Sequence, residues 1–391
     1  MLETLKYRPL DDALRKYYFR FRLAAYPQVR SFSEESMHTN TEHSQVCDSI
    51  IDMTRPELAA LMEGLGQKKF RAGQIYEWIH VKNAASYDEM TNLSKDLRAR
   101  LENEYPLRLP VRETVQISKV DGTRKYLFRM NDGNYVESVL MMYHHGNSVC
   151  ISSQVGCRMG CSFCASTIGG LTRNLTAGEM LGQIYAIERD FGQRISNVVV
   201  MGTGEPLDNY ENVVRFIRML TDADGHNISE RNVTVSTCGI VPGILKLAEE
   251  KLSINLALSL HAPNDGMRRK IMPVAKSFSL REIMDALKIY YEATHRRLTF
   301  EYSLIAGVND SDSCVRELAQ LLSGVNCLVN LIPVNPVRET GMKAPDRRAV
   351  TAFQKKLEKY AINVTIRREM GRDIDGACGQ LRKKYTETDK L

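Results

Sequence analysis

The stretch "GCRMGCSFCAS", residues 156–166, places three cysteines, Cys157, Cys161 and Cys164, within eight positions. The spacing C-x3-C-x2-C supplies one thiolate fewer than a closed zinc site uses. Three thiolates can instead bind three irons of a [4Fe–4S] cluster and leave the fourth iron open to a ligand from outside the protein. The residues alone leave three interpretations: such an open cluster, a zinc site completed by a distant ligand, or chance clustering.

From residue 148 onward, strand-like segments alternate with amphipathic helical segments. The strand-like segments are residues 148–155, 195–202, 232–239, 254–261, 298–305 and 328–335. The clearest helical segments are residues 177–192, 280–295 and 347–362. Six β-α units in series predict a parallel sheet, either doubly wound or closed into part of a barrel.

The side-chain phase of the strands favours a partial barrel. In "INLALSLH", residues 254–261, the leucines share one face, and Asn255, Ala257, Ser259 and His261 share the other. A sheet covered by helices on both faces would be apolar on both. We therefore predict an α/β fold with a partial (β/α)6 barrel whose lumen holds a ligand. The cysteine run follows the first strand, which places it at the C-terminal face, where such barrels carry out their chemistry.

Three further regions precede the barrel, which we assign to residues 148–391. Residues 1–47 are expected to be a disordered tail or sequence upstream of a start near Met53, with an RNA-binding arm as the alternative. Residues 50–105 predict a small helical domain that begins with a capping-box signature at 54–57. Residues 106–147 predict a β-rich linking region with a hairpin turn at 131–133.

Composition limits the class of protein. Of 391 residues, 43% are hydrophobic and 26% charged, which is ordinary for a globular protein, and the net charge of +6 is compatible with RNA without being diagnostic of it. No apolar run has the length of a membrane span, and no signal peptide is evident. Nine cysteines, an odd number, are poor material for a disulfide framework. We expect a cytoplasmic monomer without membrane association.

Five motifs in order carry a family resemblance: "SSQVGCRMGCSFCAST" (152–167), "MGTGEPLDNY" (201–210), "ALSLHAPND" (257–265), "IPVNP" (332–336) and "DIDGACGQL" (373–381). Together they resemble the radical S-adenosylmethionine superfamily and, within it, the RlmN/Cfr family of RNA adenine methyltransferases. The resemblance covers about residues 54–384. The "FCAST-x-GG" context is more similar to the RlmN group, which methylates C2 of adenine, than to Cfr, which methylates C8.

The resemblance implies two cofactors. A [4Fe–4S] cluster would be bound by Cys157, Cys161 and Cys164, and S-adenosylmethionine would be used twice per turnover. The implied cofactor contacts are Gly204, Glu205, Ser236, Ser259, Leu260, His261 and Asn335. An external electron donor such as flavodoxin or ferredoxin would reduce the cluster.

The resemblance also implies three catalytic residues. Cys378 would carry the methyl group as S-methylcysteine, Cys150 would be the resolving thiol in a transient disulfide with Cys378, and Glu137 would accept the C2 proton. The chemistry explains the need for a radical, because C2 of adenine lies between two ring nitrogens and is not a competent nucleophile. Four other cysteines match no functional position: Cys47, Cys238, Cys314 and Cys327. We interpret Cys238 as a packing residue.

The implied substrates are 23S ribosomal RNA, at the peptidyl-transferase centre, and the anticodon loop of some transfer RNAs. Basic groups at 68–71, 347–348, 355–356, 367–372 and 382–384 are candidates for RNA contact, or simply solvated helix faces. Three rival functions stay open: C8 methylation on the same scaffold, a non-catalytic iron–sulfur or zinc RNA-binding protein, and a radical enzyme acting on a small molecule.

Overall fold

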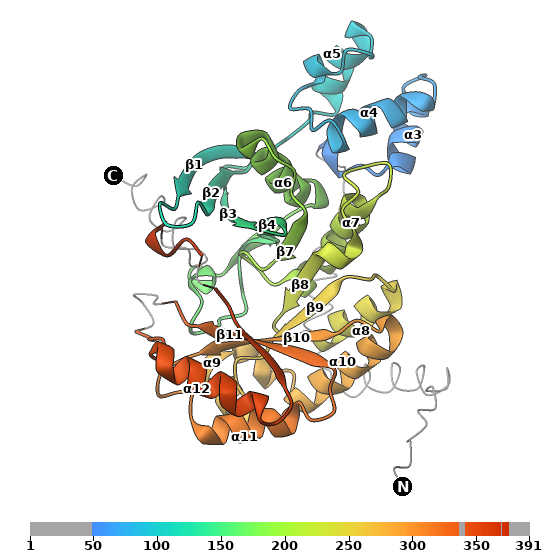
Figure 1. Ribbon diagram of the computed structural model, residues 1–391. Helices are drawn as coiled ribbons and strands as arrows, with labels where there is room; N and C mark the ends of the chain where they lie inside the picture. The colour runs from blue at the N-terminus through green and yellow to red at the C-terminus, as the bar shows by residue number, and fades with distance from the viewer. Residues whose placement is uncertain (1–48, 336–340, 369, 375–391) are drawn as a thin grey trace, which may run out of the picture. The chain divides into compact units, whose positions relative to one another are not determined.

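The computed structural model describes residues 49–335, 341–368 and 370–374 (Figure 1). Cys378 and residues 1–47 lie outside the described residues, so the predictions for them are not tested by the fold. Within the described ranges, no helix is both long enough and apolar enough to cross a membrane.

One ten-stranded sheet organises the described chain, in the order β1-β2-β3-β4-β7-β8-β9-β10-β11-β12. Its strands are β1 (Val111–Ile117), β2 (Arg124–Arg129), β3 (Tyr135–Tyr143), β4 (Gly146–Ile151), β7 (Asn197–Val200), β8 (Val233–Thr237), β9 (Asn255–Ser259), β10 (Leu298–Leu304), β11 (Cys327–Pro333) and β12 (Asn363–Ile366). Strands β1 to β4 pair antiparallel, and from β4 to β12 every neighbouring pair is parallel. A separate ribbon is formed by β5 (Gln154–Gly156) and β6 (Leu171–Asn174).

Helices connect the parallel strands and lie outside the curve of the sheet (Figure 1). They are α6 (Ala177–Phe191), α7 (Tyr210–Thr221), α8 (Val241–Glu250), α9 (Asp265–Ile271), α10 (Leu280–Thr294), α11 (Asp312–Leu321) and α12 (Arg347–Glu358). Six β/α units therefore follow one another from β4, and β12 comes last. Because β1 and β12 are the two ends of the strand order, the barrel is partial, as the side-chain phase predicts.

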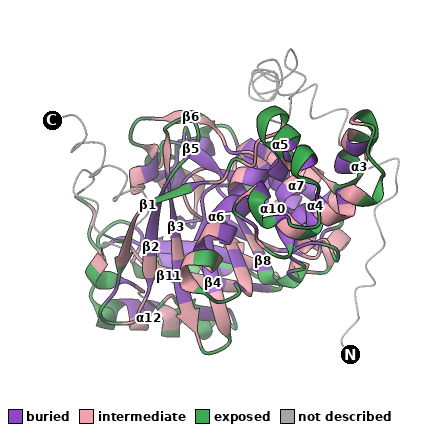
Figure 2. Ribbon diagram, turned by 90° about the horizontal axis from the view of Figure 1, so that it is seen from above, coloured by how far each residue is buried: buried purple, intermediate pink, exposed green. Residues whose placement is uncertain are grey.

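The helices form where the sequence supplies an apolar stripe and a cap. Helix α7 buries Val213, Phe216, Ile217 and Leu220 and leaves Arg218 exposed, a helical period that faces the sheet. Helices α6 and α10 each begin with a capping box, Thr176 with Glu179 and Ser279 with Glu282. Figure 2 shows the result: the strands are largely buried, and the outer helix faces are exposed.

The helices predicted before residue 105 are present as α3 (Arg55–Gly64), α4 (Phe70–His80) and α5 (Lys95–Glu104). The expected capping box forms, since the Thr54 backbone N donates to Glu57 Oε2 at 2.7 Å. Shorter 3-10 turns are η1 (Ile50–Asp52), η2 (Tyr87–Glu89), η3 (Ala165–Thr167), η4 (Pro206–Asn209), η5 (Glu230–Asn232), η6 (Pro273–Lys276) and η7 (Arg372–Ile374).

Two details differ from the sequence-based expectation. The predicted hairpin pairs β2 with β3, but these strands are not separate from the barrel, because β3 pairs with β4 and extends the same sheet. Helix α12 ends at Glu358 instead of continuing to residue 362. Ala361 has a left-handed φ of 59° and its backbone N donates to the Glu358 carbonyl, which stops the helix and lets β12 begin at Asn363.

Candidate active site

A cavity of about 250 Å³ lies at the carboxyl ends of the parallel strands. Most of the site residues expected from the sequence line it: Cys157, Cys161, Cys164, Gly204, Glu205, Ser236, Ser259, His261 and Asn335. They come from the loops and ends that follow β5, β7, β8, β9 and β11. The sheet therefore brings the motif residues to one place, although they are far apart along the chain.

Three described candidates do not line the cavity. Leu260 is fully buried behind the wall, where its backbone N donates to the Glu301 carbonyl at 3.0 Å. Cys150 and Glu137 lie on the adjacent strands β4 and β3. The fourth, Cys378, is outside the described residues.

The cysteine loop is fixed at both ends. Gly156 has a φ of 77°, and a Cβ at this position would lie 2.1 Å from the Gly170 carbonyl oxygen, so the sharp turn before Cys157 requires glycine. The Cys157 backbone N donates to that same carbonyl at 3.0 Å. Farther along the loop, the Ser162 backbone N donates to the Ile271 carbonyl at the end of α9, at 2.9 Å.

The residues present fit an iron–sulfur cluster. Burial raises the pKa of the Cys157 thiol to about 12 and also raises that of Cys161, so a metal must supply the positive charge that makes them thiolates. Among the described residues no group of His, Cys, Asp or Glu could hold a single ion. A [4Fe–4S] cluster differs, because each thiolate binds a different iron.

Arg268 provides independent support for an anionic group at this site. Its side chain is fully buried next to Cys161, and within the described chain its Nη1 has no hydrogen-bond partner. A buried cation is costly unless an anion lies near it. A [4Fe–4S] cluster with three thiolates carries a net negative charge, so the guanidinium and the donor set fit the same group.

Glu205 is held rigidly at the cavity wall. Its carboxylate accepts hydrogen bonds from Thr237 Oγ1 at 2.7 Å and from the Cys238 backbone N at 2.8 Å, and burial raises its pKa. Gly204 before it has a φ of 112°, and a Cβ there would lie 2.6 Å from Gln154 Cβ. The strand end thus presents backbone and one carboxylate, which suits an ammonium group of a ligand.

His261 is fixed in its neutral form. Its φ is 54°, and its Nδ1 accepts a hydrogen bond from the Ser303 backbone N at 2.9 Å. Burial lowers the pKa of His261 to about 3, and the positive charge of Arg268 lowers it further. Beside it, Ser236 and Ser259 place their hydroxyl oxygens 3.2 Å apart. Neutral rings and hydroxyls at strand ends are suited to hold an uncharged part of a cofactor, such as a nucleoside.

Several residues that line the cavity were not among the predicted contacts, and three of them carry ionisable side chains. Cys238, interpreted as a packing residue, is buried and also lines the cavity. Glu301 also lines it and accepts a hydrogen bond from Asn330 Nδ2 at 2.9 Å; its place on the polar face of β10 was a signal for it. Arg367 follows β12. Arg367 could have been predicted from the sequence only if β12 had been recognised as a strand of the barrel.

Cys150 and Glu137 are neighbours across β3 and β4, whose register pairs Val139 with Cys150. Burial raises the pKa of the Cys150 thiol, while the charge of Arg367 opposes this and the charge of Glu137 adds to it. The Glu137 carboxylate lies 3.4 Å from Lys125 Nζ, and both side chains are buried. The sheet therefore places a thiol, a carboxylate and two cations in one region.

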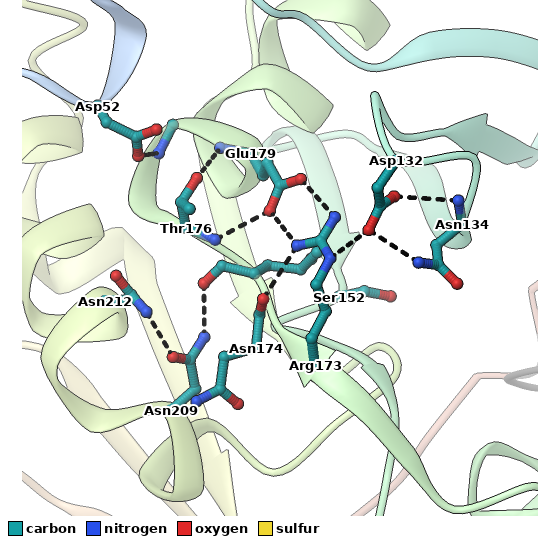
Figure 3. Close-up of polar contacts among 12 residues, drawn as sticks. Asp52, Asp132, Asn134, Ser152, Arg173, Asn174, Thr176, Glu179, Asn209 and Asn212 are labelled. Atoms are coloured by element: carbon teal, nitrogen blue, oxygen red, sulfur yellow. Dashed lines mark hydrogen bonds and ion pairs between the residues drawn. The ribbon is translucent and has the colours of Figure 1, made fainter. Parts of the chain in front are cut away.

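The hairpin that carries Glu137 is tied to the first β/α unit (Figure 3). Arg173 in β6 donates two hydrogen bonds of 2.7 Å to Glu179 in α6, and its Nε donates to Asp132 in the hairpin turn. Such a bidentate pair fixes direction as well as distance. Asp132 also accepts from Asn134, so the turn itself is ordered by the same carboxylate.

Comparison with known proteins agrees with this geometry. Residues 49–106 match the family described as ribosomal RNA large subunit methyltransferase N-terminal domain, and residues 151–322 match the radical SAM superfamily. The "Probable dual-specificity RNA methyltransferase RlmN" of Lachnospira eligens is 62% identical over 333 residues, which cover 85% of this chain and 95% of that protein. The chain belongs to the RlmN family.

Two further relatives support this assignment to the RlmN family. The protein of the same name from Lachnoclostridium phytofermentans is 61% identical over 336 residues, covering 86% of this chain and 94% of that protein. The crystal structure of a radical SAM methyltransferase from Sphaerobacter thermophilus is similar with a TM-score of 0.81 and 45% identity, over 85% of this chain and 98% of that one. Membership of the radical SAM superfamily implies a [4Fe–4S] cluster and S-adenosylmethionine as cofactors.

Proposed function

We propose that this protein methylates C2 of adenosine in 23S ribosomal RNA, at the peptidyl-transferase centre, and adenosine in the anticodon loop of some transfer RNAs. The observation that carries the proposal is the convergence of residues from separate motifs on one cavity. The names of its relatives, dual-specificity RNA methyltransferases, support the same class of substrate. The protein would act as a monomer in the cytoplasm, where both RNAs are found.

The cavity residues divide between the two cofactors. Cys157, Cys161 and Cys164 would hold the cluster, and the strand-end residues that line the cavity would hold S-adenosylmethionine, with Glu205 as the group that would receive its ammonium. When bound and reduced by a donor such as flavodoxin or ferredoxin, these cofactors would supply a carbon-centred radical that takes a hydrogen atom from the methyl group on Cys378. The resulting methylene radical can add to the electron-poor C2. Two molecules of S-adenosylmethionine are used per turnover.

Three side chains carry out the remaining steps. The Cys378 thiolate attacks the methyl carbon of one S-adenosylmethionine, forming a sulfur–carbon bond and releasing S-adenosylhomocysteine. After the methylene carbon is joined to C2, the adduct must lose one electron, which the cluster would take back, and Glu137 accepts the C2 proton. The Cys150 thiolate then attacks the Cys378 sulfur, so that the carbon leaves with its electron pair and is protonated. The resulting disulfide between Cys150 and Cys378 is reduced from outside.

The target base must leave its stack to reach the cavity, as it does in other enzymes that modify bases. This favours adenosines in loops of folded RNA. We assign RNA contact to the helical domain, residues 50–105, whose Lys68, Lys69 and Phe70 are all exposed. Arg71 lies over the Phe70 ring at 4.9 Å, a pair of the kind on which bases stack.

The test is mass spectrometry of nucleosides from ribosomal and transfer RNA, comparing a knockout strain with the strain complemented by this protein. We expect 2-methyladenosine to disappear in the knockout and to return on complementation. Complementation with Cys378→Ala should not restore it. Loss of 8-methyladenosine instead would assign C8 chemistry to the scaffold, and no change in either nucleoside would contradict the proposed substrates.

A further inference from the structure

The segment that leads to Cys378 is held at the far edge of the sheet. Strand β12 is one edge of the sheet, and β1 is the other. Residues 370–374 follow β12, yet their hydrogen bonds go to the turn at 118–123 that joins β1 to β2. The contacts connect positions 250 to 255 residues apart, so the chain crosses from one edge of the partial barrel to the other.

Three hydrogen bonds make this contact, which we name the edge clamp. The Gly371 backbone N donates to Asp121 Oδ2 at 2.9 Å. Asp373 accepts from Ser118 Oγ at 2.6 Å through Oδ1 and from the Lys119 backbone N at 2.8 Å through Oδ2. The two carboxylates of the edge clamp, Asp121 and Asp373, thus accept hydrogen bonds from the opposite segment. Hydrogen bonds to charged groups are stronger than those between neutral groups.

Hydrogen bonds within the turn at 118–123 order it independently of residues 370–374. The Ser118 backbone N donates to the Thr123 carbonyl at 2.8 Å, and the Thr123 backbone N donates to Asp121 Oδ1 at 3.0 Å. Thr123 is fully buried, and a Cβ at Gly371 would lie 3.0 Å from its Cγ2. Because Gly371 also has a φ of 64°, glycine fits this contact and other residues do not.

Charge keeps the edge clamp closed at neutral pH. Burial opposes ionisation of Asp121, but hydrogen bonds from Gly371 and Thr123 hold its pKa at about 2. The hydrogen bond from Ser118 lowers the pKa of Asp373. Both groups are thus ionised throughout the physiological range, and the edge clamp is not a pH switch.

The position of the edge clamp limits where Cys378 can go. Cys378 is four residues beyond Ile374, and four residues span at most about 14 Å. Without the edge clamp, the nearest fixed point is Arg367, whose backbone N donates to the Leu331 carbonyl at 2.8 Å, eleven residues before Cys378. Effective concentration falls with about the −3/2 power of tether length, so release would lower it about fivefold.

We infer that the edge clamp positions the Cys378 thiol for its steps in the reaction, with Asp373 and Ser118 as positioning residues. The inference rests on the proposed function, in which Cys378 carries the methyl group. Asp373 touches neither cluster nor cofactor, since it does not line the cavity. Its role is to shorten the tether.

The test compares Asp373→Ala with Lys119→Ala in the cluster-loaded enzyme. Asp373→Ala removes both hydrogen bonds that the carboxylate accepts, whereas Lys119→Ala keeps the backbone N–H that donates to Asp373. We measure the rate at which the Cys378 peptide gains a methyl group by mass spectrometry, the 5′-deoxyadenosine released per methylated adenosine, and the iron content.

The hydrogen bond of Gly371 with Asp121 remains in Asp373→Ala and still fixes the chain seven residues before Cys378. We therefore expect Asp373→Ala to slow methylation of Cys378 about twofold and to raise the 5′-deoxyadenosine released per product, with iron content unchanged. Lys119→Ala should match the unsubstituted enzyme. The double variant Ser118→Ala/Asp373→Ala should be no slower than Asp373→Ala, because both changes break the same contact.

Two results would contradict the positioning role of the edge clamp without contradicting the proposed function. Asp373→Ala could methylate Cys378 as fast as Lys119→Ala, or it could lose iron, which would show that the substitution disturbs the fold. If the unsubstituted enzyme gains no methyl group at Cys378, the proposed function fails, and this inference fails with it. The methylation state of the unsubstituted enzyme therefore separates the two cases.

Discussion

The junction between α4 and the barrel helices buries polar side chains in a different way from the cavity. At the junction, side chains bind side chains: His80 Nδ1 lies 2.9 Å from the Tyr185 hydroxyl, and the Tyr76 hydroxyl donates to Asp222 at 2.9 Å. At the cavity, Glu205 and Arg268 bind mainly backbone groups at the ends of strands.

This difference in hydrogen-bond partners distinguishes a structural contact, such as the junction, from a ligand-binding site, such as the cavity. Where buried side chains bind one another, they join two elements, although His80 Nε2 has no hydrogen-bond partner within the described residues. Where charged side chains hold strand ends in place, the thiols and hydroxyls beside them stay directed to the cavity, as Cys161, Ser236 and Ser259 do. Burial of polar groups alone does not locate an active site, because both regions have it.

We expect the largest effect on stability and cluster binding from a substitution of Arg268, beside the cavity. Arg268 donates to the carbonyl oxygens of Cys238 at 2.5 Å and of Leu260 at 3.2 Å. The Leu260 carbonyl also accepts from the Ala262 backbone N at 2.8 Å, so of these two acceptors Arg268→Met would leave only the Cys238 carbonyl without its donor, at a cost of about 1–3 kcal/mol. We expect the free energy of unfolding to fall by about 1–3 kcal/mol and the cluster to be lost, measured by urea unfolding and iron content.

Arg269→Met is the matched control, because Arg269 is the next residue of α9 and is exposed. It should change the free energy of unfolding by less than about 0.5 kcal/mol. Equal effects of the two substitutions would contradict the role of Arg268. The loss of free energy of unfolding in Arg268→Lys should lie between those of Arg268→Met and Arg269→Met, since lysine keeps the charge but not the planar set of donors.

The second effect tests the junction by pH. Burial lowers the pKa of His80 to about 3, with Asp222 raising it and His226 lowering it, against about 6.5 in the unfolded chain. Between these values the unfolded chain binds the proton and the folded one does not, so stability is lost as the pH falls below about 6.5. From pH 7 to 5 this histidine should cost about 2 kcal/mol.

His80→Gln should remove that part of the acid sensitivity, measured as the change in the free energy of unfolding between pH 7 and 5. His144→Gln, at an exposed histidine, is the control and should leave the slope unchanged. If His80→Gln kept the full acid loss, His80 would not be the neutral partner of Tyr185.

The third effect concerns a different contact, the packing of η1 on the start of α6. A Cβ at Gly178 would lie 2.6 Å from Ile51 Cγ2 and 2.9 Å from Asp52 Oδ1, which accepts from the Gly178 backbone N at 2.6 Å. Gly178→Ala should cost about 1–2 kcal/mol by overpacking, while the cluster spectrum stays the same. Gly64→Ala, where nothing lies within 4 Å, should not destabilise the protein.

The sequence predicts the cavity far better than the junction, for a physical reason. Period-two alternation places Glu301 and Ser303 on the lumen face of β10, and the loops after strands converge in any parallel barrel. The junction instead depends on pairs such as His80 with Tyr185, which are 105 positions apart. No local pattern marks such a pair.

Residues at and beside the cavity that the sequence analysis did not find were missed for the same reason. Arg268 and Arg269 are adjacent residues of one type, and only tertiary packing buries the first and exposes the second. Arg367 was considered only with the surface cations, because β12 has four residues and follows a helix that was expected to run to 362. The family resemblance supplied roles for residues that phase alone would have left as strand ends.

The smallest effect concerns Arg158, which lies inside the cysteine run and which sequence reasoning passed over. Its guanidinium pairs with Asp208, a buried carboxylate in η4 just after Glu205, and Asp208 also accepts from Gln154 Nε2 at 3.1 Å. Arg158 is 36% exposed, so the pair is partly screened. Arg158→Gln should lower the free energy of unfolding by only about 1 kcal/mol.

Arg158→Gln should affect iron retention more than the free energy of unfolding, because the pair of Arg158 with Asp208 joins the cysteine loop to the loop that carries Glu205. We expect Arg158→Gln to release iron to a chelator several times faster than the unsubstituted protein, and Arg158→Lys to be intermediate. Arg100→Gln, which breaks the surface pair with Glu104 in α5, should leave iron release unchanged. Equal release from Arg158→Gln and Arg100→Gln would mean that backbone contacts such as that of Ser162 with Ile271 hold the loop without help from the pair.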